Sequence, residues 1–162
     1  LKTTAAYGSP NDFSMEGKGL QFEEVMSLTL DVPVDCVVVA HFGCYFTWVG
    51  DNAKLEDEVT GLGTNWTTLD WFPYADYFDV QEHFADFRLL INGEDVCKTF
   101  SYPFLRQSQS TYMTGALQVS AGQIKVSVEA KLFRNDKGKI EASNLFYYII
   151  KDRNLVMQAK KR

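Results

Sequence analysis

The sequence of 162 residues is poor in the residues on which many enzyme and metal sites depend. It has two histidines, His41 and His83, and three cysteines, Cys36, Cys44 and Cys97. The spacings of a serine-hydrolase elbow, a zinc-protease helix, a cysteine-pair zinc site and a phosphate-binding loop are all missing. An odd cysteine count without a motif predicts buried, unpaired thiols. These absences weigh against catalysis, and they leave a small enzyme that uses His41 or His83 as the alternative.

The chain also lacks a long apolar run and an excess of positive charge. No apolar stretch approaches the roughly 18 residues of a membrane-spanning helix, so no membrane insertion is expected. The net charge of −5 argues against a nucleic-acid partner. The sequence begins at Leu1, which leaves open whether it is a fragment of a longer protein. The thiol pattern allows a cytoplasmic location, so the compartment stays open as well.

Helical periodicity is nearly absent, and alternation with a period of two takes its place. Residues 24–32, 36–48 and 124–132 carry apolar side chains at every second position, and Asn92-Gly93 is a two-residue hairpin signal. About seven to ten strands with short turns are typical of a sandwich. We predict an all-β fold: a two-sheet antiparallel β-sandwich, jelly-roll-like, with a long aromatic and acidic loop over about 49–83.

Three segments of the chain differ in composition. Residues 1–19 are small, polar and rich in turn formers, which indicates a flexible arm or linker with a strand allowed near Phe13. Residues 20–155 hold the alternating segments and are predicted to form the β-sandwich domain. Residues 156–162 end in three basic residues and are predicted to be a basic tail.

The stretch TNWTTLDWFPYADYFD (64–79) fits neither period and is dense in aromatic and acidic residues. Exposed aromatic faces can cover the C–H side of a sugar while carboxylates accept hydrogen bonds from its hydroxyls. The candidate ligand-binding residues are therefore Trp66, Asp70, Trp71, Tyr74, Asp76 and Tyr77. In the first alternative, several of these rings plug the open end of the sandwich as additional core. In the second, residues 64–83 cover an active site that uses His41 or His83.

Hard oxygen donors precede this stretch at Asp51, Asn52 and Asp57. Calcium takes such ligands, but the spacing of an EF-hand loop is missing here. Acidic clusters of this kind are usually solvated loops. We therefore expect no cofactor, with calcium at these three residues as the alternative.

Two strands are apolar on faces that a two-layer sandwich usually leaves in water. Residues 145–150 are apolar on both faces, and the outer face of 36–48 is partly apolar. The simplest cover is another copy of the chain. This predicts an oligomer interface, on this face or the alternate one, formed by Val37, Val39, Tyr45, Tyr147 and Ile149. Cover by the arm or by the 49–83 loop is the alternative.

Four segments carry a resemblance to known β-sandwich modules. LTLDVPVDCVVVAHFGCYF (28–46) and NLFYYIIKD (144–152) resemble the early and closing strands of jelly-roll head domains of the TNF and C1q type. FRLLINGEDV (87–96) and GALQVSAGQIKVSVEAKL (115–132) look like the strand pattern of these modules and of phage and bacterial fibre tips. The resemblance implies a trimer, an extracellular, virion or cell-surface setting, and no catalytic residues.

These observations together predict a non-enzymatic binding module that self-associates. Its partners would be further copies of the chain, and a protein receptor or a saccharide as the resemblance implies.

Overall fold

The computed structural model describes residues 2–7, 13–16, 21–50, 83–101, 108–134 and 146–161. The regular elements within these ranges are β-strands, and no helix there is long and apolar enough to cross a membrane. The strands are β1 (Lys2–Tyr7), β2 (Phe13–Glu16), β3 (Glu23–Val32), β4 (Cys36–Gly50), β5 (His83–Ile91), β6 (Glu94–Ser101), β7 (Gln109–Val119), β8 (Gly122–Arg134) and β9 (Phe146–Lys160).

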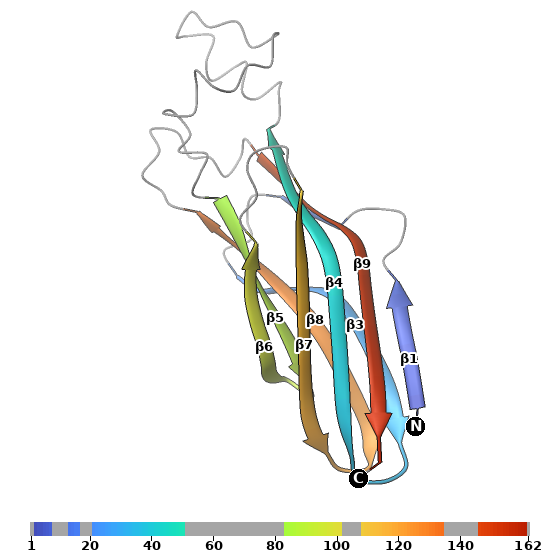
Figure 1. Ribbon diagram of the computed structural model, residues 1–162. Coiled ribbons are helices and arrows are strands. Elements are labelled where there is room, and N and C mark those ends of the chain that lie inside the picture. The colour runs from blue at the N-terminus through green and yellow to red at the C-terminus, as the bar shows by residue number, and fades with distance from the viewer. Residues whose placement is uncertain are drawn as a thin grey trace, which may run out of the picture.

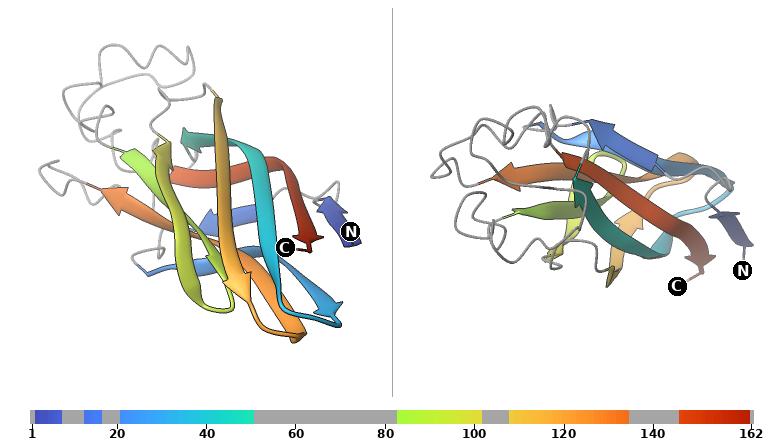
Figure 2. Two further views of the ribbon diagram at one scale, coloured as in Figure 1. Left: turned by 60° about the horizontal axis from the view of Figure 1, so that its bottom comes forward. Right: turned by 90° about the horizontal axis from the view of Figure 1, so that it is seen from above.

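The strands form two antiparallel sheets that pack against each other (Figure 1). One sheet has the order β1-β9-β4-β7, with β2 also paired to β9, and the other has the order β3-β8-β5-β6. Figure 2 shows the same two layers from two further directions. These two strand orders are those of a jelly roll, in which the chain passes repeatedly from one sheet to the other. The predicted all-β, two-sheet sandwich is confirmed.

The core lies between the sheets and follows the alternation seen in the sequence. On β4 the even-numbered side chains are buried: Cys36, Val38, Ala40, Phe42, Cys44 and Phe46. The rings of Phe42 and Phe46 meet Phe87 of the opposite sheet, with centroids 6.4 and 6.1 Å apart. Full burial of one such ring stabilises the fold by roughly 1.5–3 kcal/mol. The buried thiols of Cys36 and Cys44 are unpaired, as predicted.

Short turns close one end of the sandwich, and the predicted hairpin is among them. Asn92 and Gly93 both adopt positive φ, 50° and 82°, which a two-residue turn of this type requires. Asn92 also fastens the turn to β8, because its backbone N–H donates to the Lys125 carbonyl and its Oδ1 accepts from the Lys125 N–H. The ends of β4 and β8, and the start of β5, lie at the opposite end of the sandwich (Figure 1).

The structure differs from the sequence prediction at both ends of the chain. β1 and β2 lie within the predicted arm and pair with β9, which confirms only the strand expected near Phe13. β9 continues to Lys160, through most of the predicted basic tail, and buries Leu155, Met157 and Ala159. The two chain ends hydrogen-bond to each other, since β1 and β9 are neighbours. Each terminal strand therefore depends on pairing with the other end of the chain, and neither is evident from its own local sequence.

A β-bulge in β9 explains why its second half escaped the alternation pattern. Gly43 pairs with Asn154 while Tyr45 pairs with Lys151, so β9 carries one extra residue against β4. Asp152 in this bulge has a φ of 48°. The inward positions change from even, at Ile150, to odd after the bulge. A uniform period of two therefore ends at the bulge although the strand does not.

Candidate functional site

The outer face of the β1-β9-β4-β7 sheet is the first candidate site, and we call its central part the β4 face. Because β4 buries its even-numbered side chains, its odd-numbered residues turn outward, with residues of β7 and β9 beside them. The β4 face consists of Val37, Val39, His41, Gly43 and Tyr45 on β4, of Ser110, Tyr112, Thr114, Ala116 and Gln118 on β7, and of Lys151, Asn154, Val156, Gln158 and Lys160 on β9. Its two charged members both lie on β9.

Two exposed tyrosines lie on either side of a glycine on the β4 face. Tyr112 is 64% exposed and Tyr45 is 46% exposed. Gly43 lies directly opposite Tyr112, so no side chain rises from β4 at this point. A Cβ added at Gly43 would lie 3.2 Å from Nδ2 of Asn154, which shows that the Asn154 amide covers this position from β9. The two tyrosine rings and the Asn154 amide together form an exposed surface that offers both aromatic contacts and hydrogen-bonding groups.

His41, one of the two alternative catalytic residues, belongs to this surface. Its Nδ1 lies 3.1 Å from the Tyr112 hydroxyl and 3.0 Å from Oγ1 of Thr114, and its ring stacks on that of Tyr112. Both partners are hydroxyls, and among the described residues no carboxylate contacts the imidazole. His41 therefore orients an exposed tyrosine. The other alternative, His83, begins β5, where the structure describes the backbone alone.

Cys44 offers no nucleophile to His41, because the two residues face opposite sides of the sheet. Cys44 is buried in the core, and burial raises the pKa of its thiol to about 12, against a smaller lowering by the charge of Arg153. A thiol in this state is inert at neutral pH. This arrangement agrees with the opposite parity of His41 and Cys44 along one strand.

The structure brings the predicted interface residues onto two neighbouring strands. Val37, Val39 and Tyr45 lie on β4, and the backbones of Ile149 and Tyr147 pair with Thr47 and Val49 of that strand. Their role in self-association stays a prediction.

Sequence reasoning missed the β7 residues of the same surface. Tyr112, Thr114 and Ala116 lie beside Gly43, His41 and Val39. The alternation of exposed and buried residues along β7 could have indicated that these side chains turn outward. That β7 lies beside β4, however, follows from the strand order of the sheet and not from local sequence.

The remaining predicted site residues lie outside the described residues. These are the ligand-binding candidates Trp66, Asp70, Trp71, Tyr74, Asp76 and Tyr77 and the metal candidates Asp51, Asn52 and Asp57. In the ranges that the structure does describe, no group of three or more His, Cys, Asp or Glu residues could hold a metal ion.

The outer face of the other sheet, which we call the β5 face, is charged. Arg88 donates to Oε2 of Glu129 at 2.6 Å and lies 3.8 Å from Asp95. Lys98 lies 2.7 Å from Asp95. A separate pair joins Lys125 and Glu24 at 2.6 Å.

Two of these carboxyls have lowered pKa values. The hydrogen bond from Lys125 lowers the pKa of Glu24, with a further contribution from the Ser27 hydroxyl. The hydrogen bond from Lys98 lowers the pKa of Asp95 in the same way. Both groups are largely solvated, so each pair contributes little to stability.

Comparisons with known proteins bear on the fold. No protein-family model and no curated protein matches the chain. It is similar to chains from the structures of infectious bursal disease virus Gt strain and of infectious bursal virus derived T=1 particles, each with a TM-score of 0.51 and 9% identity over 98% of this chain. The match covers 33% and 32% of those chains, so this chain spans about a third of their length.

A further match is the sugar-binding EclA C-terminal domain, at 14% identity and a TM-score of 0.37, which covers 98% of this chain and 79% of that one. At these identities the likeness to the viral chains shows the β-sandwich fold alone, and the TM-score of the EclA match is too low to carry an argument.

Proposed function

We propose that this protein is a non-enzymatic binding or assembly module that self-associates through its β4 face. The observation that carries the proposal is that this face has two exposed tyrosines and that its β7 and β4 residues carry no charge. Aromatic residues are enriched and charged residues depleted at the centre of protein interfaces. His41 supports the same role, because its hydrogen bond and stacking fix one of the rings in place.

A second copy of the chain is the occupant that suits this surface. A face that meets itself brings its own charges together, and charges of one sign then repel, so a self-contact favours a surface with an uncharged centre. Val39 and Ala116 lie side by side near its middle, and Lys151 and Lys160 lie toward its two ends. The β5 face, with its closely spaced ion pairs, would bring like charges together in the same arrangement.

The finer form of the proposal is a trimer that binds a protein receptor or a saccharide, as the TNF and C1q resemblance implies. The similar viral chains include one from T=1 particles, an assembled setting, which supports association by analogy of fold. The Trp66 to Tyr77 candidates belong to this finer form.

Sedimentation equilibrium across a concentration series up to the millimolar range tests the proposal. We expect the mass to rise with concentration, and Val39→Lys to weaken association about tenfold or more, because burying an unpaired ammonium is costly. Thr29→Lys is the matched control, since Thr29 is exposed on β3 of the other sheet, and it should leave the mass unchanged. A threefold mass supports the trimer and a twofold mass replaces it with a dimer. A monomer at every concentration, or equal loss in both variants, overturns the proposal.

A further inference from the structure

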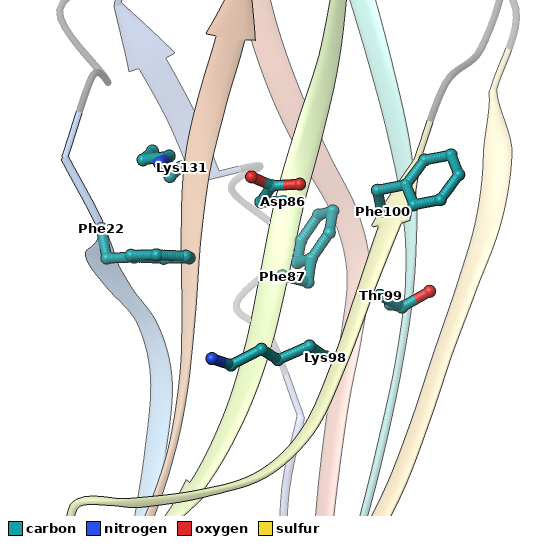
Figure 3. Close-up of a pocket in the computed structure, with 7 residues that line it drawn as sticks. All are labelled: Phe22, Asp86, Phe87, Lys98, Thr99, Phe100 and Lys131. Atoms are coloured by element: carbon teal, nitrogen blue, oxygen red, sulfur yellow. The ribbon is translucent and has the colours of Figure 1, made fainter.

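The β5 face holds a pocket of about 350 Å³ that the function proposed above does not use. Figure 3 shows it with Phe22 and Phe100 at its two sides and Asp86 between them. Lys98, Thr99 and Lys131 complete the polar part of its wall, over the buried ring of Phe87. Its volume is at the lower end of those typical of small-ligand sites.

The pocket is organised as a row that crosses all four strands of the sheet. Phe100 on β6 pairs with Asp86 on β5, and Asp86 pairs with Lys131 on β8. Phe22 comes immediately before β3, and its ring lies 5.3 Å from the Lys131 ammonium. Three strand spacings, or about 14 Å, separate the backbones of the two outer strands. The site therefore suits an elongated ligand.

Charge pairing on the β5 face singles out two groups within this row. Arg88 is held by Glu129, and Lys98 by Asp95. Asp86 and Lys131 have no ion-pair partner among the described residues, although both line the pocket. One carboxylate and one ammonium thus lie side by side between two phenylalanine rings. The Phe22 ring is fixed by the Arg88 guanidinium, which lies 4.1 Å from its centroid.

We propose that this pocket binds an anionic saccharide. Phe100 is 66% exposed and offers a ring face to the C–H side of a sugar. Asp86 accepts hydrogen bonds from sugar hydroxyls, and the Thr99 hydroxyl can donate or accept. Lys131 pairs with the acidic group of the ligand, whether a carboxylate or a sulfate ester. The pocket lies on the sheet opposite the β4 face, so binding does not depend on self-association.

The test is a titration of the isotope-labelled full chain with 3′-sialyllactose, 3′-sulfolactose and neutral lactose, followed by amide chemical shifts. We expect saturable shifts at Asp86, Thr99, Phe100 and Lys131. Both anionic sugars should bind about threefold to fivefold more tightly than lactose, the range of an exposed charged hydrogen bond. The tighter of the two identifies the acidic group.

Three variants separate the parts of the site. Lys131→Gln should remove the preference for the anionic sugars while leaving lactose binding unchanged. Phe100→Ala should weaken the binding of all three sugars by about fivefold or more, as for an aromatic side chain that the ligand covers. Lys125→Gln is the matched control, because Lys125 lies on the same strand and face but is paired with Glu24, and it should bind as the unsubstituted chain does.

Three results would overturn the proposal. One is the absence of saturable shifts with any of the three sugars in the millimolar range. Another is a set of shifts centred on residues 64–79 or on the β4 face. The last is an anionic preference that survives Lys131→Gln. Because Phe100 is exposed, its truncation should not unfold the chain, and an unchanged thermal midpoint checks this.

Discussion

The β4 face and the β5 face are the two outer sides of one sandwich, yet the side chains that they expose to solvent differ in kind. The β4 face presents tyrosines, valines and hydroxyls, and its charge is confined to β9. The β5 face pairs Arg88 with Glu129 and Lys98 with Asp95, and leaves aromatic rings at its edges. Inward residues are similar on both sheets, because both must fill the same core. The outward residues therefore carry the information about function.

The difference also separates two modes of contact. A surface whose centre is uncharged can pair with its own copy with little repulsion, whereas the β5 face holds fixed charges suited to a smaller polar ligand. An assembly built through the β4 face would leave every β5 face outward. If the pocket binds a saccharide as proposed, several weak sites on one assembly would act together, and their combined affinity would exceed that of one site.

The largest expected effect is on the stability of the whole sandwich, because Phe87 belongs to the core that both sheets share. Its ring is buried against Phe42 and Phe46 of the other sheet, and Phe87 also lines the pocket on the outer side. Phe87→Ala should lower the free energy of unfolding by about 3–5 kcal/mol through cavity formation. Urea unfolding measures this, with exposed Phe100→Ala as control. A loss below about 1 kcal/mol would mean that the two sheets do not share this contact.

The next effect concerns the edge where the two sheets meet. Gly115 of β7 lies against Val96 of β6, and a Cβ added at Gly115 would be 2.8 Å from the Val96 Cβ and 3.2 Å from its carbonyl oxygen. Gly115→Ala should destabilise the fold by about 1–3 kcal/mol through overpacking. Adding Val96→Ala should restore part of the loss in the same thermal unfolding measurement. If the single substitution is neutral, this close approach of the sheets is not present in solution.

The smallest expected effect is a pH-dependent change in stability, which should appear for a variant of the β5 face and not for one of the β4 face. The folded pKa of Glu24 is lowered below its ordinary 4.5 by Lys125 and Ser27. Its contribution is therefore fully present above the unfolded pKa and is lost as pH falls through the lower, folded value. Glu24→Gln should be slightly less stable than the unsubstituted chain at pH 7, and the difference should disappear in acid and shrink with added salt.

The control for this measurement is Tyr45→Phe on the β4 face, which removes an exposed hydroxyl and changes no carboxylate. Its stability difference should stay constant over the same acidic range. A pH-independent deficit in Glu24→Gln would show that the pair with Lys125 contributes nothing in solution.

Much of the fold could be predicted from sequence, because the central strands alternate cleanly. On β4 every even residue from Cys36 to Phe46 is apolar, and each of them is buried. The edge strand β1, Lys2–Tyr7, carries no such alternation. Its partner β9 changes its inward parity at Asp152, so a uniform period of two does not extend to the end of that strand.

The candidate sites were less accessible to sequence reasoning. The β4 and β9 residues were indicated by apolar side chains where water was expected, but Tyr112 and Thr114 reach the same surface only through the jelly-roll order. The pocket is an extreme case. Phe22 precedes one outer strand of a sheet and Phe100 belongs to the other, and local sequence carries no signal that they lie at the two sides of one pocket.

The bulge at Asp152 changes which residues of β9 face the core, from even-numbered before it to odd-numbered after it. Upstream of it Ile150 points inward, and downstream Leu155, Met157 and Ala159 do. Deleting this one exposed residue would remove the bulge and give β9 a uniform period of two, with Ile150, Leu155, Met157 and Ala159 still facing the core. A single-residue deletion farther along the strand, where no extra residue can absorb it, would instead exchange the buried and exposed sides of the residues that follow.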